Sequence, residues 1–348
     1  MKKAIYSILA ASMLAACSYS DNFEINDTAE IPSSRKTLAA TPVVSLSASE
    51  ASKVIGFAKS GDEIVIGHFN ADHKAVAINL KSQARQNLFQ TTNRTEKAGT
   101  CSFEVNGSKP ARTFNYRTGQ LTEASALSTR SGESATATIQ LPKDQKHLQV
   151  ARAGKFIIAT GLYAQGRYLL YTPETGEADY QGSYPEHPVY PDIQESTKSI
   201  LYASTVLKVS PDQQSFVCAD KYSGYIEFCR ISGDRINQGK SYCFHHPRVA
   251  INENARCKVG YYRTNQFGFT DITVSDDRVF AIYSGQTNRE AKNAAQQCKK
   301  MMVFDWDGNL LETYDLATPL TSISYDEAED AIYGLGYTPD PAVVKISL

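Results

Sequence analysis

Histidines, cysteines and paired acids are the residues of this chain best suited to catalysis or metal binding. Its six histidines include one adjacent pair, His245 and His246. Adjacent side chains of a strand point to opposite faces, so these two cannot easily share one metal ion. The paired acids Asp276-Asp277 and Asp305-Trp306-Asp307 stand in turn sequences, where aspartate usually caps its own backbone.

Familiar catalytic motifs are not found in the sequence. It contains no HExxH motif, no GxSxG motif, no Walker loop and no GxGxxG in a βαβ context. The cysteine spacings do not match the CxxC chemistry of metal sites. We therefore predict no catalytic residue, no metal ligand and no cofactor.

Six cysteines follow residue 17, and an even number permits disulfides outside the cytoplasm. One pair follows from local geometry. Strands are expected at 215–220 and 225–231, and Ser223-Gly224 between them can form a two-residue hairpin turn. That register places Cys218 opposite Cys229, within reach of a disulfide. Two buried thiols on one face of the sheet are the alternative.

Tyrosine dominates the aromatic residues, with 20 Tyr, 14 Phe and one Trp. Its flat ring and polar tip suit contacts with sugars or proteins. We therefore take Tyr261, Tyr262 and Tyr283 as candidate binding residues. Arg263 beside them is a candidate to reach the mouth of a central channel and meet an anionic group. Packing between sheets is the alternative use of these rings.

A targeting signal opens the chain. Lys2 and Lys3 precede an apolar stretch at 4–13 that is too short for a permanent membrane span. The next residues, Leu14-Ala15-Ala16-Cys17, resemble a bacterial lipobox. That resemblance implies cleavage before Cys17 and lipidation of this cysteine, with palmitate among the acyl chains. We expect residues 1–16 to be the signal peptide and the polar residues 17–40 to form a flexible tether.

Acyl chains on Cys17 would hold the protein on a membrane. Ser18 follows the cysteine, whereas Asp at that position favours inner-membrane retention in enteric bacteria. We therefore expect a protein of the cell envelope, anchored in the outer membrane on its periplasmic or surface side. The formal net charge of -1 argues against a nucleic-acid partner, which normally requires an excess of basic residues.

Five turn–strand–turn–strand units begin near residues 60, 153, 210, 275 and 325. The first interval is about twice the others, so a sixth unit is expected near Val105-Asn106-Gly107. Four-stranded sheets repeated radially at this spacing are typical of a propeller, which protects its sheet edges. The sequence predicts an all-β, six-bladed β-propeller over residues 41–348, with five or seven blades as alternatives.

Ring closure and one insertion can also be predicted. The last unit supplies three strands, and residues 42–47 supply a fourth, so we predict that 42–47 pair with 342–348. Residues 288–300 are rich in helix formers. They predict a short helical insertion that lies over one rim of the propeller.

The strands and turns at 278–285, 303–311, 323–326 and 331–333 form a recognisable pattern around Asp305-Trp306-Asp307-Gly308. They resemble a TolB-like six-bladed propeller family, whose members are bacterial surface or periplasmic lipoproteins. The resemblance is closest from about residue 265 onward and looser back to about residue 150. It implies a fold and a location, and it assigns no active site.

Two functions from different classes follow from these patterns. The first is a membrane-anchored propeller that binds a protein or glycan partner without catalysis. The alternative is a hydrolase or lyase that acts on a glycan or peptide at the channel mouth, which fold analogy alone supports weakly. Two acids, or a histidine beside an acid, converging at the channel would favour the enzyme.

Overall fold

The computed structural model describes residues 28–69, 71–90, 98–105, 111–124 and 137–348. The predicted signal peptide, Cys17 and the first part of the predicted tether lie outside these residues. Asn106 and Gly107 of the predicted sixth turn also lie outside them. No helix within the described ranges is long and apolar enough to cross a membrane.

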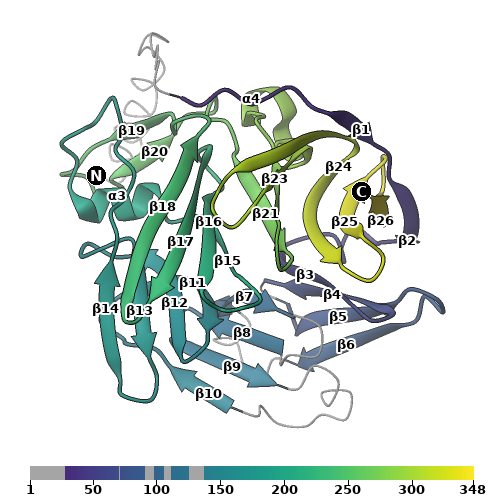
Figure 1. Cartoon of the computed structure of the whole chain (residues 1–348), viewed down its shortest axis with the longest axis horizontal. Helices are drawn as coiled ribbons and strands as arrows, with labels where there is room; N and C mark the ends of the chain where they lie inside the picture. Colours follow the sequence, from purple (N-terminus) through teal and green to yellow (C-terminus); the bar gives the residue numbers. More distant parts are fainter. Residues whose placement is uncertain (1–27, 70, 91–97, 106–110, 125–136) are drawn as a thin grey trace, which may run out of the picture.

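Six four-stranded antiparallel sheets make up the molecule, and we number them as blades 1 to 6 in chain order (Figure 1). Blades 5 and 6 share the long strand β24, so their hydrogen bonding is continuous. Each blade begins with its innermost strand. Blade 1 contains β3 (Val54–Ser60), β4 (Glu63–His68), β5 (His73–Asn79) and β6 (Arg85–Gln90). Blade 2 contains β7 (Thr100–Glu104), β8 (Ala111–Asn115), β9 (Gln120–Ala124) and β10 (Ala137–Gln140). Blade 3 contains β11 (Lys146–Ala153), β12 (Phe156–Leu162), β13 (Tyr168–Thr172) and β14 (Glu177–Gln181). Blade 4 contains β15 (Thr205–Val209), β16 (Ser215–Asp220), β17 (Tyr225–Ser232) and β18 (Arg235–Cys243). Blade 5 contains β21 (Phe269–Val274), β22 (Val279–Tyr283), β23 (Cys298–Phe304) and the first half of β24 (Leu310–Asp326). Blade 6 contains the second half of β24, β25 (Ala331–Tyr337), β26 (Pro341–Ser347) and β2 (Thr41–Ser45).

The innermost strands form a closed cycle. Contacts run from β3 to β7, β11, β15, β21, β24 and back to β3. A cycle of sheets that meets itself is a propeller, because stacked sheets would leave two ends. The predicted all-β fold with six blades is confirmed.

Both ends of the chain meet in blade 6. Strand β2 pairs antiparallel with β26, with Thr41 opposite Lys345 and Ser45 opposite Ala342. Val44 and Val343 face each other in this ladder and are almost completely buried. The predicted closure of the ring by the first and last strands is confirmed.

Strand β24 belongs to two blades, although the sequence counts them as separate units. It runs without a break from the outer edge of blade 5 to the inner position of blade 6. Its first half pairs with β23 and its second half with β25. Leu320 at the crossing is fully buried, which holds this part of the strand against the core.

The predicted tether at 17–40 is corrected in its second half, which lies docked on the propeller. The amide of Ala29 donates to the carbonyl of Cys243 in blade 4. Strand β1 (Lys36–Leu38) then pairs in parallel with β24 at 314–316, and Arg35 forms an ion pair with Glu312. This segment lacks hydrophobic periodicity because it covers the edge of an existing sheet and contributes few core residues of its own.

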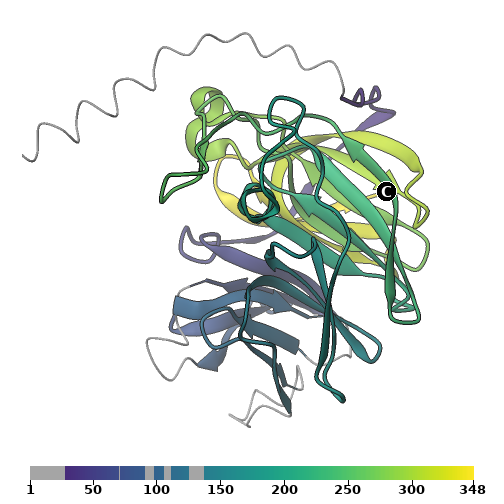
Figure 2. The same ribbon diagram turned by 90° about the vertical axis from the view of Figure 1, so that its left-hand side faces the viewer.

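Three insertions gather at one end of the propeller. Helix α3 (Glu195–Leu201) precedes blade 4, and strands β19 (Val249–Ile251) and β20 (Val259–Tyr261) precede blade 5. Helix α4 (Asn288–Ala291) and the 3-10 helix η3 (Lys292–Ala294) separate β22 from β23. In a four-stranded meander, connections from strand 2 to 3 and from strand 4 to the next blade leave from the same end. Figures 1 and 2 show α3 and α4 at this common end.

The insertion predicted at 288–300 is present but shorter than expected. Thr287 caps α4 through a reciprocal capping box with Glu290. Lys292 adopts a positive φ of 49° and ends the α-helix. The residues from Cys298 onward belong to β23, since blade 5 requires them for its third strand.

The predicted register of the hairpin in blade 4 is wrong. Cys218 lies opposite Glu227, and Cys229 lies opposite Phe216. The connection is longer than two residues, because Lys221 donates to the Ser204 carbonyl and Gly224 to the His245 carbonyl. Both cysteines are buried free thiols that pack in the same cluster, which is the alternative arrangement.

Aromatic side chains fill the spaces between neighbouring blades. The ring centroids of Tyr168 in blade 3 and Phe216 in blade 4 lie 5.0 Å apart. Those of Phe228 in blade 4 and Phe304 in blade 5 lie 5.2 Å apart. Burial of these rings fixes the relative positions of the blades, and with them the strands that surround the central channel.

Candidate functional site

Among the cavities of the described residues, one lies in the central channel, and we call it the channel cavity. Its volume is about 450 Å³, and its walls come from the inner strands of all six blades. In blades 1, 5 and 6 the lining residues stand at the beginnings of these strands, on the end that carries the insertions, whereas in blades 2, 3 and 4 they extend into the second halves of the strands. Asn293 and Gln296 of the blade 5 insertion also line it. The insertion therefore lies at the mouth of the channel.

Charged side chains concentrate where blades 4 and 5 meet in this cavity. Lys208 lies on β15, Lys221 follows β16, and Asp271 lies on β21. We call these three residues the channel cluster. Inner strands β15 and β21 contact each other, so the three side chains share one part of the wall.

Asp271 is held in place by backbone amides. One of its carboxylate oxygens accepts from the amide of Ile272 at 2.9 Å, and the other accepts from the amide of Ile323 in blade 6 at 3.0 Å. Burial raises the pKa of Asp271 above its usual value, while nearby Lys208 and the two amides act in the opposite direction. The carboxylate thus also links blade 5 to blade 6.

Lys208 and Lys221 differ from Asp271 in their contacts. Neither ammonium group has a hydrogen-bond or ion-pair partner among the described residues. Burial lowers the pKa of Lys221, and the charge of Asp271 opposes that effect. An ammonium group that has lost part of its water and has no direct partner is favourably placed to receive an anion.

The arrangement that would favour a hydrolase or lyase is not found among the described lining residues. Their two acids are Glu104 of blade 2 and Asp271 of blade 5, which are opposite positions in a ring of six. Glu104 is already paired with Arg112 at 3.3 Å. No histidine lines this part of the described cavity. The described residues also contain no group of three His, Cys, Asp or Glu residues that could hold a metal ion.

The candidate binding residues from the sequence lie outside this cavity. Tyr283 is buried in the core, and its hydroxyl lies 2.8 Å from Nδ1 of His245. Tyr261 donates to the Leu201 carbonyl at 2.6 Å and stacks near Tyr222. Both rings thus serve packing, the alternative that the sequence left open.

Tyr262 is half-buried and Arg263 is exposed. The carbonyl of Arg263 accepts from the amide of Arg289, which joins two of the insertions. Arg263 is not among the residues that line the channel. Its side chain therefore faces the surface of the insertions.

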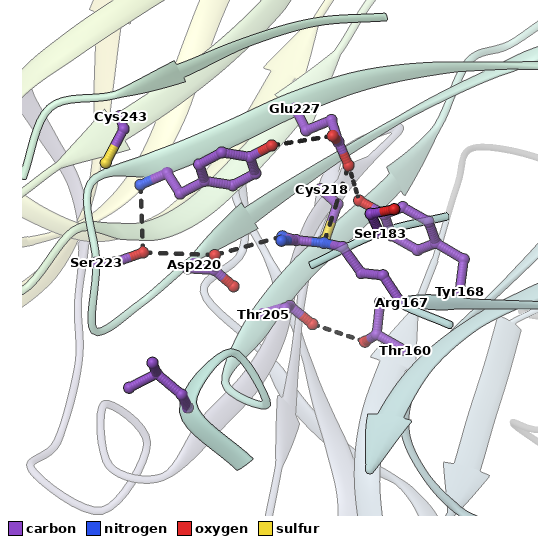
Figure 3. A network of polar contacts seen from close by, with 12 residues as sticks. Thr160, Arg167, Tyr168, Ser183, Thr205, Cys218, Asp220, Ser223, Glu227 and Cys243 are labelled. Carbon is purple, nitrogen blue, oxygen red and sulfur yellow. Dashed lines mark hydrogen bonds and ion pairs between the residues drawn. The ribbon is translucent and has the colours of Figure 1, made fainter. Parts of the chain in front are cut away.

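A second polar group lies sealed between blades 3 and 4 (Figure 3). Arg167, just before β13, is 2% exposed and lies 3.3 Å from Asp220 at the end of β16. Glu227 on β17 accepts from the hydroxyl of Tyr168 at 2.5 Å and from that of Tyr225 at 3.0 Å. We call Arg167, Asp220 and Glu227 the interblade cluster.

The interblade cluster holds one cation and two acids, and Nε and Nη1 of Arg167 and Oδ1 of Asp220 are buried without a hydrogen-bond partner among the described residues. Burial raises the pKa of Asp220 to about 6, and the guanidinium of Arg167 opposes this effect. The ring of Tyr225 lies under the same guanidinium, 4.8 Å away. None of the described residues that line the channel cavity belongs to the cluster. Its contacts join blades 3 and 4.

Sequence reasoning missed both clusters. Lys208, Lys221 and Asp271 stand in ordinary strand and turn sequences, and no spacing connects them. Arg167 follows Gly166 in a sequence that is equally ordinary. The only available signal is a charged residue at an inner-strand position of a predicted blade, as at Lys208 and Asp271.

A family model described as TolB-like 6-blade propeller-like matches residues 113–328. No curated protein has a matching sequence. The chain is similar to a streptogramin B lyase structure at 12% identity, over 89% of this chain and 87% of that chain, with a TM-score of 0.46. It is similar to BamB from Moraxella catarrhalis at 8% identity, over 84% and 69%, with a TM-score of 0.41. A structure of the mitotic checkpoint complex gives 10% identity, 93% and 84% coverage, and a TM-score of 0.49.

Proposed function

Because the chain belongs to the TolB-like six-bladed propeller family, we propose that it is a lipid-anchored protein of the cell envelope that binds its partner at the insertion-bearing end of the channel. The β-propeller fold supports a binding or scaffold role in general. We further propose that the protein is lipidated at Cys17, lies at the outer membrane, and binds a protein or a glycan.

The observation that carries this proposal is the cavity of about 450 Å³ beneath the insertions. Its size is that of a ligand site, and its wall presents polar and charged groups from several blades. The three insertions contact one another there, through Tyr261 and Leu201 and through Arg263 and Arg289. A rigid ring with an elaborated, hollow end offers one defined binding face.

The binding face is tested by cross-linking in living cells. A photoreactive amino acid at Gln296 lies at the channel mouth, and one at Ser232 lies at the exposed end of strand β17, at the other end of the propeller. We expect a discrete cross-linked product from position 296 and none from position 232. Equal products from both positions, or products from 232 alone, would contradict the proposed face.

The lipid anchor is tested separately. Cys17→Ala is expected to move the protein from the membrane fraction to the soluble fraction and to remove the acyl mass from the N-terminal peptide. Cys257→Ala replaces an exposed cysteine far along the chain and is the matched control. Unchanged fractionation of Cys17→Ala would contradict lipidation at this residue.

A further inference from the structure

The channel cluster has a charge that the protein does not balance locally. Lys208 and Lys221 are basic residues and Asp271 is acidic, so the cluster holds one more basic group than acidic groups. Both oxygens of Asp271 already accept backbone amides, at 2.9 and 3.0 Å. The carboxylate therefore lowers the local potential without binding either ammonium group directly.

The shape of the wall adds a second observation. The Lys221 amide bonds to Ser204, and Lys208 lies four residues further along the same side of blade 4, yet both residues line the same cavity. Ser322 and the amide side chains of Asn293 and Gln296 line the same space and can hydrogen-bond neutral polar atoms. The wall thus combines a positive centre with neutral hydrogen-bonding groups.

We propose that the channel binds a small hydrophilic ligand through a single carboxylate group held between Lys208 and Lys221. One carboxylate group of a ligand would offset the excess of one basic group in the channel cluster. Lysines act as point charges and lack the planar fork with which arginine grips phosphate or paired oxygens. This inference rests on the proposed channel function and names the chemical class of its ligand.

The proposal is tested by titration calorimetry of the purified full-length protein with matched probes. Glucuronate and glucuronamide differ only in the carboxylate, and glutamate and glutamine differ in the same way on an amino-acid frame. We expect at least one acid to bind about tenfold more tightly than its amide. The pair that shows the difference separates a sugar acid from an acidic amino acid as the source of the carboxylate.

Variants of the two lysines locate the site. Lys208→Met and Lys221→Met should each weaken binding of the preferred acid by about tenfold, since each removes one charged hydrogen-bond donor. Lys155→Met changes an exposed lysine in a turn of blade 3 and should leave the affinity unchanged. Asp271→Asn should tighten binding because it removes the opposing charge, and thermal unfolding of each variant verifies its fold.

Three outcomes would overturn the proposal: acids and amides that bind equally, tighter binding of inorganic phosphate than of either acid, or lysine variants that retain full affinity. The proposed function fails separately. Cross-links at Gln296 without a preference for acids would support the proposed binding face and contradict the proposed carboxylate ligand. A preference for acids without cross-links at Gln296 would support the carboxylate site and contradict the proposed partner at the channel mouth.

Discussion

Asp220 and Lys221 are neighbours in the chain, yet they belong to two different polar regions. Asp220 turns into the interblade cluster, where Arg167 lies 3.3 Å away and both side chains are almost fully buried. Lys221 turns into the channel, where its ammonium group has no partner among the described residues. The first region is closed on itself and the second is open to a cavity.

The two regions differ in the role of their charged residues, which is structural in the interblade cluster and functional in the channel cluster. A buried charge that is paired within the protein holds blades together, and removal of its partner is costly. A partly buried charge without a partner contributes little to stability, because its desolvation is not offset. Such a group persists where a ligand supplies the missing charge. The two clusters should therefore respond in opposite directions to substitution.

Arg167→Met tests the closed region and should have the largest effect. It leaves Asp220 and Glu227 buried without their cation and should lower the free energy of unfolding by about 3–5 kcal/mol, measured by urea denaturation. Arg230→Met is the matched control, because Arg230 pairs with Asp307 while 65% of its side chain is exposed. That control should change stability by less than about 1 kcal/mol.

Replacement of the whole closed cluster sharpens this test. Adding Asp220→Asn and Glu227→Gln to Arg167→Met removes the unpaired acids and should restore part of the lost stability. Equal losses for Arg167→Met and Arg230→Met would show that the interblade cluster is not a structural pair.

His245 extends the comparison to a buried neutral group. Burial lowers its pKa to about 4, and its ring lies against Tyr283 and the Gln266 carbonyl. At pH values between this pKa and the usual pKa of histidine, the unfolded chain binds more protons than the folded protein. The free energy of unfolding therefore decreases as the pH falls through this range. Between pH 7 and pH 5 this residue alone should cost about 2 kcal/mol.

The measurement compares urea denaturation of the wild type and His245→Gln at both pH values. The wild type should lose more stability than the variant, and the difference isolates His245. This comparison is needed because Asp220, whose pKa is raised to about 6, contributes with the opposite sign over the same range. A parallel pH dependence of both proteins would mean that His245 is protonated in the fold.

Lys221→Met tests the open region and should have the smallest effect, with the opposite sign. The apolar side chain keeps much of the packing and removes the partly desolvated charge, so unfolding should require about 1 kcal/mol more free energy. Lys155→Met again serves as the exposed control. A clear loss of stability in Lys221→Met would place Lys221 with Arg167 among the structural charges.

The overall architecture follows from the sequence because it depends on local signals. Turn residues repeat at a nearly regular spacing, and the segment between two such turns places the strand Ser215–Asp220 at the bounds that the structure has. Val43 and Val44 near the start and Val343 and Val344 near the end supply matching apolar strands. Six blades and their closure could be predicted from these patterns alone.

Local signals were insufficient where a distant partner decides the geometry. Ser223-Gly224 has the composition of a tight turn, yet Gly224 bonds to His245, and the register of Cys218 and Cys229 changes with it. Tyr283 has the character of a binding residue, but a neighbouring blade buries it. The direction of Asp220 and Lys221 is likewise set by the blades on either side. Composition and periodicity thus determined the ring, whereas the packing of blades decided which charges are enclosed and which face the channel, because burial depends on residues far apart in the chain.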